Sequence, residues 1–93
     1  MKSAPYRWTI TKDRLADEEE PEGTCCNAKG MSGPYNASDD VTDNPTRFSM
    51  YDDDGNCYYE GMIYGDFDGL EPLYDFGMPN AGCTAMKLDG EWL

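Results

Sequence analysis

RFSMYDDDGNCYYEGMIYGD, residues 47–66, is the stretch that decides the fold of this chain. It holds two runs rich in Phe, Tyr, Met and Ile, and a polar break over residues 52–56 separates them. A short break that contains Gly between two β-prone runs is typical of a β-hairpin. We therefore expect two antiparallel strands joined by a tip that carries three consecutive carboxylates.

Two further segments have the pattern of a strand. Apolar and polar residues alternate over residues 6–12, and this period of two is typical of a strand with one buried face. Residues 83–88 predict a last strand, which ends at a tight turn over residues 89–90. Trp92 is expected to pack back onto the domain.

Helix is expected only in short pieces. Asp13 suits the cap of a helix over residues 14–20, although the same acidic stretch also suits an exposed loop. A helical turn is expected over residues 69–76, and a long loop rich in Gly, Pro, Asn and Ser is expected over residues 21–45. The predicted fold is a single domain over residues 1–93, α+β but mostly β, with a small antiparallel sheet of three to four strands, long loops and one or two short helical turns.

Charge is the strongest functional clue. The 93 residues include 19 Asp and Glu against 7 Lys and Arg, and from Phe48 to the C-terminus there are ten acids and one base, Lys87. The net charge of −12 costs a small domain stability through self-repulsion. Direct binding of nucleic acid or of an anionic membrane is not expected, because phosphates are bound by Lys and Arg. The expected partner is a positively charged protein, and the alternative is a solvated acidic surface without a partner.

The sequence has no apolar run that would span a bilayer and no pattern of a secretory signal, so we expect a cytoplasmic protein. In that compartment Cys25, Cys26, Cys57 and Cys83 are expected to be free thiols. Adjacent Cys25 and Cys26 are poorly spaced as metal ligands, and the chain has no His. No metal or other cofactor is therefore predicted.

Calcium binding and catalysis are two other functions that a cluster of acids suggests. When Gly55 or Gly69 is placed at the sixth position of an EF-hand loop, the first position falls on Met50 or Tyr64, neither of which is a ligand. A calcium site built from other loops stays an alternative. Catalysis is not expected, because the commonest general base, His, is missing and no Ser or Cys lies in a nucleophile pattern.

A folded array of carboxylates can take the place of nucleic-acid phosphates, because acids on one face of a strand recur every ~6.6 Å. In its size, acidity, lack of His and β-rich pattern the chain resembles the small DNA-mimic proteins of phages and mobile elements, of the anti-CRISPR and antirestriction kinds. These proteins share no motif, so the resemblance transfers no residue by position. Residues 75–83 also resemble a stretch of small uncharacterised phage-borne proteins, which implies no activity.

The resemblance implies a non-enzymatic inhibitor in the host cytoplasm that blocks the positively charged nucleic-acid-binding groove of a defence complex. The leading candidate for this complex is a CRISPR effector. An immunity-type protein that neutralises a basic toxin or nuclease is the alternative from another class. The acids expected to contact the partner are Asp52, Asp53, Asp54, Glu60, Asp66, Asp68 and Glu71, with Asp39, Asp40 and Asp43 as a second group.

Overall fold

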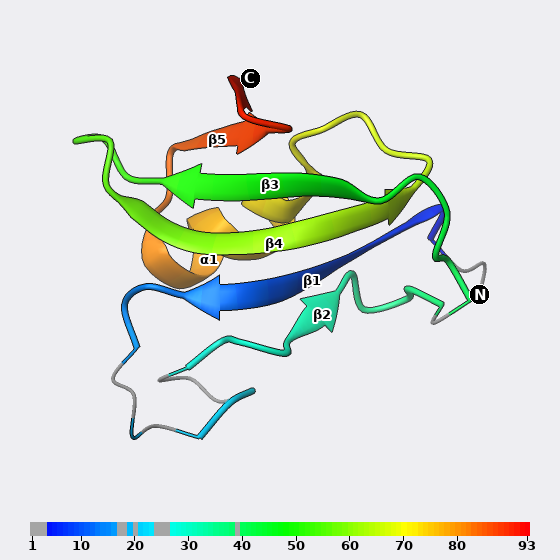
Figure 1. Cartoon of the computed structure of the whole chain (residues 1–93), viewed down its shortest axis with the longest axis horizontal. Helices are drawn as coiled ribbons and strands as arrows, with labels where there is room; N and C mark the ends of the chain where they lie inside the picture. Colours follow the sequence, from blue (N-terminus) through cyan, green and yellow to red (C-terminus); the bar gives the residue numbers. More distant parts are fainter. Residues whose placement is uncertain (1–3, 17–18, 20, 24–26, 39) are drawn as a thin grey trace.

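A computed structural model describes residues 4–16, 19, 21–23, 27–38 and 40–93 of the chain. Within these residues six strands form one antiparallel sheet in the order β2-β1-β4-β3-β5-β6 (Figure 1). A π-helical turn, η1, and a short α-helix, α1, lie between β4 and β5. The elements are β1 (Tyr6–Asp13), β2 (Ser32–Gly33), β3 (Thr46–Tyr51), β4 (Cys57–Gly65), η1 (Leu73–Gly77), α1 (Met78–Ala81), β5 (Ala85–Leu88) and β6 (Glu91–Trp92).

The hairpin predicted from the sequence forms the centre of the sheet. β4 pairs with β3 on one side and with β1 on the other. Along β4 the residues Tyr59, Gly61, Ile63 and Gly65 are buried, and those between them are partly exposed. This alternation turns one face of β4 toward a core and the other toward the opposite side of the sheet.

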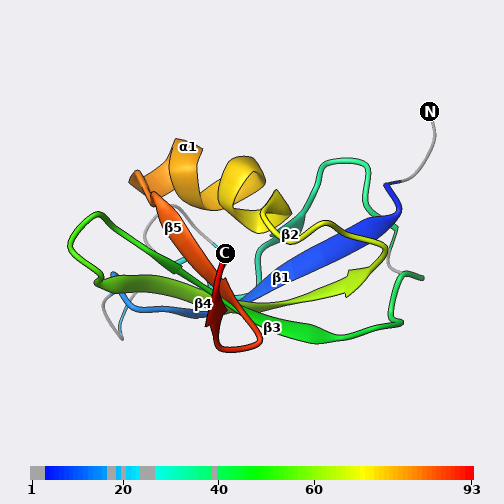
Figure 2. The ribbon, with the colours of Figure 1, turned by 90° about the horizontal axis from the view of Figure 1, so that it is seen from above.

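The core lies on one face of the sheet, beneath the helical segment of η1 and α1. Figure 2 shows this segment on one side of the sheet and no layer on the other. The ring of Phe76 lies 5.4 Å from the ring of Trp8 and 5.0 Å from that of Tyr59, measured between centroids. The buried residues of this core are Trp8, Ile10, Ala28, Phe48, Met50, Tyr59, Ile63, Leu73, Phe76, Cys83 and Met86.

Asp75 and Gly77 hold the helical segment close to the sheet. The carboxylate of Asp75 accepts hydrogen bonds from Tyr6 Oη at 2.9 Å and from Trp8 Nε1 at 3.0 Å. A Cβ atom at position 77 would collide with Met50, so glycine is needed for the close approach of helix and sheet. The segment ends at Gly82, which has a φ of 70° and donates its N–H to the carbonyl of Met78.

The predicted antiparallel and mostly β architecture is confirmed, but the predicted number of three to four strands is wrong. The additional strands are β2 and β6, which have two residues each and pair at the edges of the sheet. β2 lies inside the segment 21–45 that was predicted to be loop. Among the described residues of the segment 14–20, residues 14–16 form a turn and not a helix, and the Asp13 carboxylate accepts the N–H of Leu15 there.

Two tyrosines, the buried Tyr59 and the half-buried Tyr6, give the domain an alkaline limit. Burial raises the pKa of Tyr59 to about 12, and burial together with the hydrogen bond to Asp75 raises the pKa of Tyr6 above its usual value. A raised pKa in the folded state means that stability is complete below the unfolded pKa of about 10 and is lost as the pH rises through the folded pKa. We expect the urea midpoint to fall steeply between pH 10 and 12, and less steeply in Tyr59→Phe. If the urea midpoints of the wild type and of Tyr59→Phe fell equally, ionisation of Tyr59 would not be a cause of the alkaline loss of stability.

Candidate functional site

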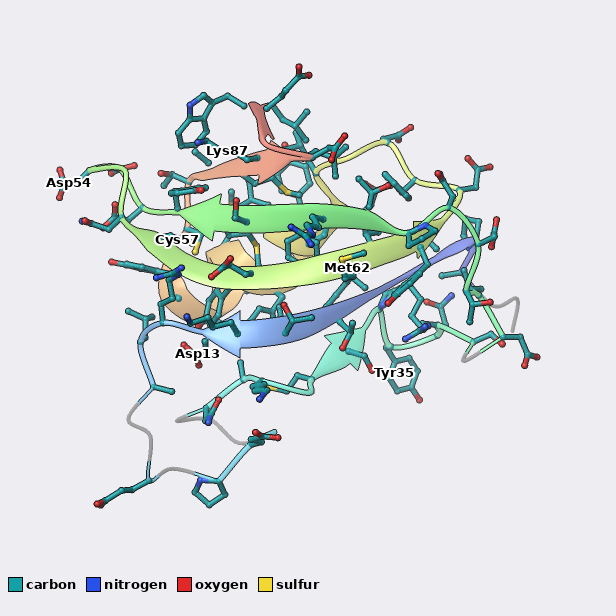
Figure 3. All side chains as sticks on the ribbon, in the orientation of Figure 1. Asp13, Tyr35, Asp54, Cys57, Met62 and Lys87 are labelled. Atoms are coloured by element: carbon teal, nitrogen blue, oxygen red, sulfur yellow. The ribbon has the colours of Figure 1, made fainter. Side chains whose placement is uncertain are left out.

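Eight of the predicted contact acids lie at the two ends of the sheet, in two groups. One group, the tip acids Asp52, Asp53 and Asp54, lies in the turn between β3 and β4, and Figure 3 shows Asp54 at that end of the molecule. A second group lies at the opposite end of β4, in the loops before β3 and after β4. We name these the loop acids, and they are Asp40, Asp43, Asp66, Asp68 and Glu71.

Two hydrogen bonds bring the loops of the second group together. Gly65 donates its N–H to the carbonyl of Asp43 at 2.7 Å, and its own carbonyl accepts a hydrogen bond from Asn44 Nδ2 at 3.2 Å. β4 separates the loop acids from the tip acids, and nine strand residues span about 30 Å. The two groups therefore lie near the two ends of the longest dimension, which is 34 Å between Cα atoms.

Asp52 closes the hairpin turn. Its carboxylate accepts the N–H groups of Asp54 at 2.9 Å and Asn56 at 2.8 Å, and its second oxygen accepts Asn56 Nδ2 at 3.0 Å. The hydrogen bonds from Asn56 lower the pKa of Asp52. Asp53 and Asp54 are exposed, and among the described residues their carboxylates form no hydrogen bond or ion pair. Asp53 and Asp54 are therefore the tip acids best placed to meet a partner.

The loop acids divide in the same way. The Glu71 carboxylate accepts the N–H groups of Asp68 and Gly69, each at 2.6 Å, and so holds the loop after β4. Asp66 and Asp68 are exposed, and their carboxylates have no hydrogen-bond or ion-pair partner in the described part of the chain. Asp40 and Asp43 are exposed as well.

Glu60 belongs to neither acidic group. It projects from the middle of β4 on the face without helices, and its carboxylate pairs with Arg14 Nε at 2.8 Å. Asp39 lies outside the described residues. The structure thus divides the predicted contact residues into two end groups and one paired acid on the open face.

Sequence reasoning missed the basic character of that open face. Arg7, Arg47 and Lys87 project from β1, β3 and β5 on the side opposite the helical segment, which faces the viewer in Figure 3. A hollow of about 630 Å³ lies on this face, and its lining includes Arg47, Glu60 and Met62. The alternation of buried and exposed residues along the strands could have revealed this face. Each of the three cations is next in sequence to a residue that points into the core, so the cation itself points to the opposite face.

Among the described residues, the two thiols are protonated and the acids are not grouped around a metal site. Burial raises the pKa of Cys83 to about 11, and burial also raises the pKa of Cys57, so both thiols stay protonated near neutral pH. Cys57 and Cys83 are free, and Cys25 and Cys26 lie outside the described residues. In the described part of the chain no three Cys, Asp or Glu side chains are grouped to hold a metal ion. No described helix has the length and apolar character needed to cross a membrane.

Comparison with known proteins adds no family to these observations. No protein-family model matches the chain, and neither does any curated protein or any solved structure. The function is therefore inferred from the geometry and charge of the chain itself.

Proposed function

We propose that this protein is a non-enzymatic inhibitor that occupies a positively charged nucleic-acid-binding groove of another protein. The observation that carries the proposal is the separation of two exposed acidic groups along the longest axis of the molecule. One turn of a DNA duplex measures about 34–36 Å. The two acidic groups are therefore separated by roughly the distance between phosphates one turn apart on the same side of a duplex. The proposed target is a cytoplasmic defence complex of the host, and the leading candidate is a CRISPR effector.

The exposed carboxylates suit such a partner because they are free to contact it. Asp53, Asp54, Asp66 and Asp68 would exchange water for the cations of the groove, without first breaking an ion pair among the described residues. The net charge of −12 would attract a basic groove at long range and raise the rate of association. Salt screens exposed charges over about 8–10 Å, so binding by this mechanism weakens as the ionic strength rises.

Reversing Asp53, Asp54, Asp66 and Asp68 to Lys is expected to abolish binding to the target. The measurement is displacement of a fluorescent duplex from a purified CRISPR effector, with a loss of competition of at least ~100-fold for a variant that turns attraction into repulsion at both ends. Asp52 and Glu71 stay unchanged, because their carboxylates hold backbone N–H groups. Retained displacement by the folded variant would overturn the proposal.

A matched control separates the position of the charges from their total. Glu19 and Glu91 are exposed acids outside both end groups, so Glu19→Lys with Glu91→Lys changes the net charge as much as Asp66→Lys with Asp68→Lys. We expect the first pair to displace the duplex nearly as well as wild type and the second pair to lose at least about tenfold. Equal losses would show that only total charge matters.

A pull-down from host lysate identifies the class of partner without naming it beforehand. The protein is expected to retain DNA-binding complexes at low salt, to release them at high salt, and to lose them when DNA of arbitrary sequence is added in excess. Retention of a basic toxin or nuclease that excess DNA does not displace would instead support the immunity-type alternative. Retained proteins that all lack nucleic-acid-binding grooves would contradict the proposal.

A further inference from the structure

The open face of the sheet carries cations that have no acidic partner in the part of the chain that the structure describes. Arg7 donates its Nε–H to the carbonyl of Val41 at 3.1 Å, and neither Arg47 nor Lys87 donates a hydrogen bond among the described residues. The ion pairs of the described residues involve Arg14 and Lys29 only. In a chain with 19 acids and 7 bases, three cations on one face without a carboxylate partner among the described residues are a marked segregation of charge.

The strand register places these three cations on a diagonal across the sheet. Arg7 lies opposite Tyr64, Arg47 lies opposite Met62, and Lys87 lies opposite Ser49, which in turn lies opposite Glu60. Strands are about 4.8 Å apart and two residues span about 6.7 Å, so the backbone of Arg47 is roughly 12 Å from that of Arg7 and 8 Å from that of Lys87. We name Arg7, Arg47 and Lys87 the cation row.

Aromatic rings lie at both ends of the cation row. The guanidinium of Arg7 is 4.5 Å from the ring centroid of Tyr64. At the other end Lys87 Nζ is 4.7 Å from the ring centroid of Trp92 and 5.5 Å from that of Tyr51. The side chain of Trp92 is 56% exposed, so its ring is accessible to a ligand.

The hollow between these ends is lined by both polar and apolar residues, and one of its two acids is paired with a cation. Thr11 and Ser49 contribute hydroxyl groups to the hollow. Met62, labelled in Figure 3, also lines it. The acids that line it are Glu60, which Arg14 neutralises at 2.8 Å, and Asp89 in the turn between β5 and β6. The cation row therefore gives this face a local charge opposite to that of the whole chain.

We propose that the open face binds a single strand of nucleic acid along the cation row. An extended single strand supplies phosphates for the cations and unpaired bases that stack on the rings at either end, as on other open sheets and grooves that hold single strands. A duplex hides its bases from such stacking, and an acidic peptide would use the cations but not the rings. This inference goes beyond the proposed function, because it concerns a different surface and does not require a basic partner. It departs from the expectation that the chain does not bind nucleic acid directly, because that expectation rested on the net charge and not on the charge of one face.

The test uses a fluorescent oligothymidine of about ten nucleotides, a length within the range of such sites. We expect binding to raise its anisotropy and to change the emission of Trp92, since the other tryptophan, Trp8, is 4% exposed. Arg47→Gln is expected to weaken binding by at least about fivefold, and replacement of the whole cation row by Gln by at least about fiftyfold. The matched control Lys29→Gln removes a cation that pairs with Glu22 at 3.2 Å, and it should leave binding unchanged.

Three results would overturn the inference. They are no binding of the oligothymidine by the wild-type protein at low salt, equal weakening by Lys29→Gln and Arg47→Gln, and equally tight binding of polyglutamate or of a duplex of the same length. Trp92→Phe keeps an aromatic ring at position 92, so this variant is expected to fold and to bind the strand. The change in tryptophan emission on binding should disappear, because the remaining Trp8 is buried. Arg47→Gln is expected to displace duplex from the effector as wild type does, so the two proposals can fail independently.

Discussion

Replacing Gly61 by Val is expected to lower the free energy of unfolding by more than about 3 kcal/mol, a large part of the total for a domain of this size. Gly61 is buried in the middle of β4, between β1 and β3. A Cβ atom there would collide with the carbonyl oxygen of Thr9 and with the ring of Phe48. Overpacking a filled core by methylene groups costs about 1–3 kcal/mol or more, and here a backbone atom must also move. A domain of this size has a total stability of roughly 5–14 kcal/mol.

Circular dichroism and urea denaturation measure this effect. Ala85→Val is the matched control, because Ala85 lies on the open face opposite Tyr51 and extra methyl groups there need not enter the core. We expect this control to change the free energy of unfolding by no more than a surface substitution does, about 0.5 kcal/mol. A Gly61→Val protein that melts like wild type would show that β4 does not run between β1 and β3 in this register.

Truncating Phe76 to Ala is expected to cost about 3–5 kcal/mol of the free energy of unfolding. The ring of Phe76 is 5% exposed and packs on the rings of Trp8 and Tyr59, so its loss opens a cavity between the helical segment and the sheet. Tyr74 is two residues away on the same segment and is 60% exposed. Tyr74→Ala is therefore the control, expected to change stability by less than about 0.5 kcal/mol. Equal losses in the two urea titrations would mean that this segment does not cover the core.

The hairpin was predictable because local chemistry decides it. Alternating aromatic and aliphatic residues give β3 and β4, and the Asp52 carboxylate closes the turn between them by hydrogen bonds to residues two and four positions later. β2 and β6 were not predictable, because two residues carry no period and their pairing comes from neighbouring strands. The helical segment continues through Gly77, where a Cβ atom would collide with Met50, and through Pro79, which lies in the first turn of α1, where proline is tolerated.

The candidate site was predictable in composition and not in arrangement. The sequence places Asp54 and Asp66 in one acidic stretch, whereas the strand between them carries them to opposite ends of the molecule. Asp52 and Glu71 turn out to bind backbone N–H groups, which depends on loop conformation. The positive open face was missed because a net charge averages over the whole surface, while the pleat sorts side chains by face.

The brevity of the outermost strands has a consequence for the protein at high concentration. An exposed strand edge offers unpaired N–H and C=O groups on which further chains can assemble into aggregates and fibrils. Here the sheet is bordered by β2 and β6, each only two residues long. Edge strands this short offer an incoming strand few backbone groups to pair with. β2 and β6, which the sequence does not predict, therefore protect the sheet against edge-to-edge polymerisation.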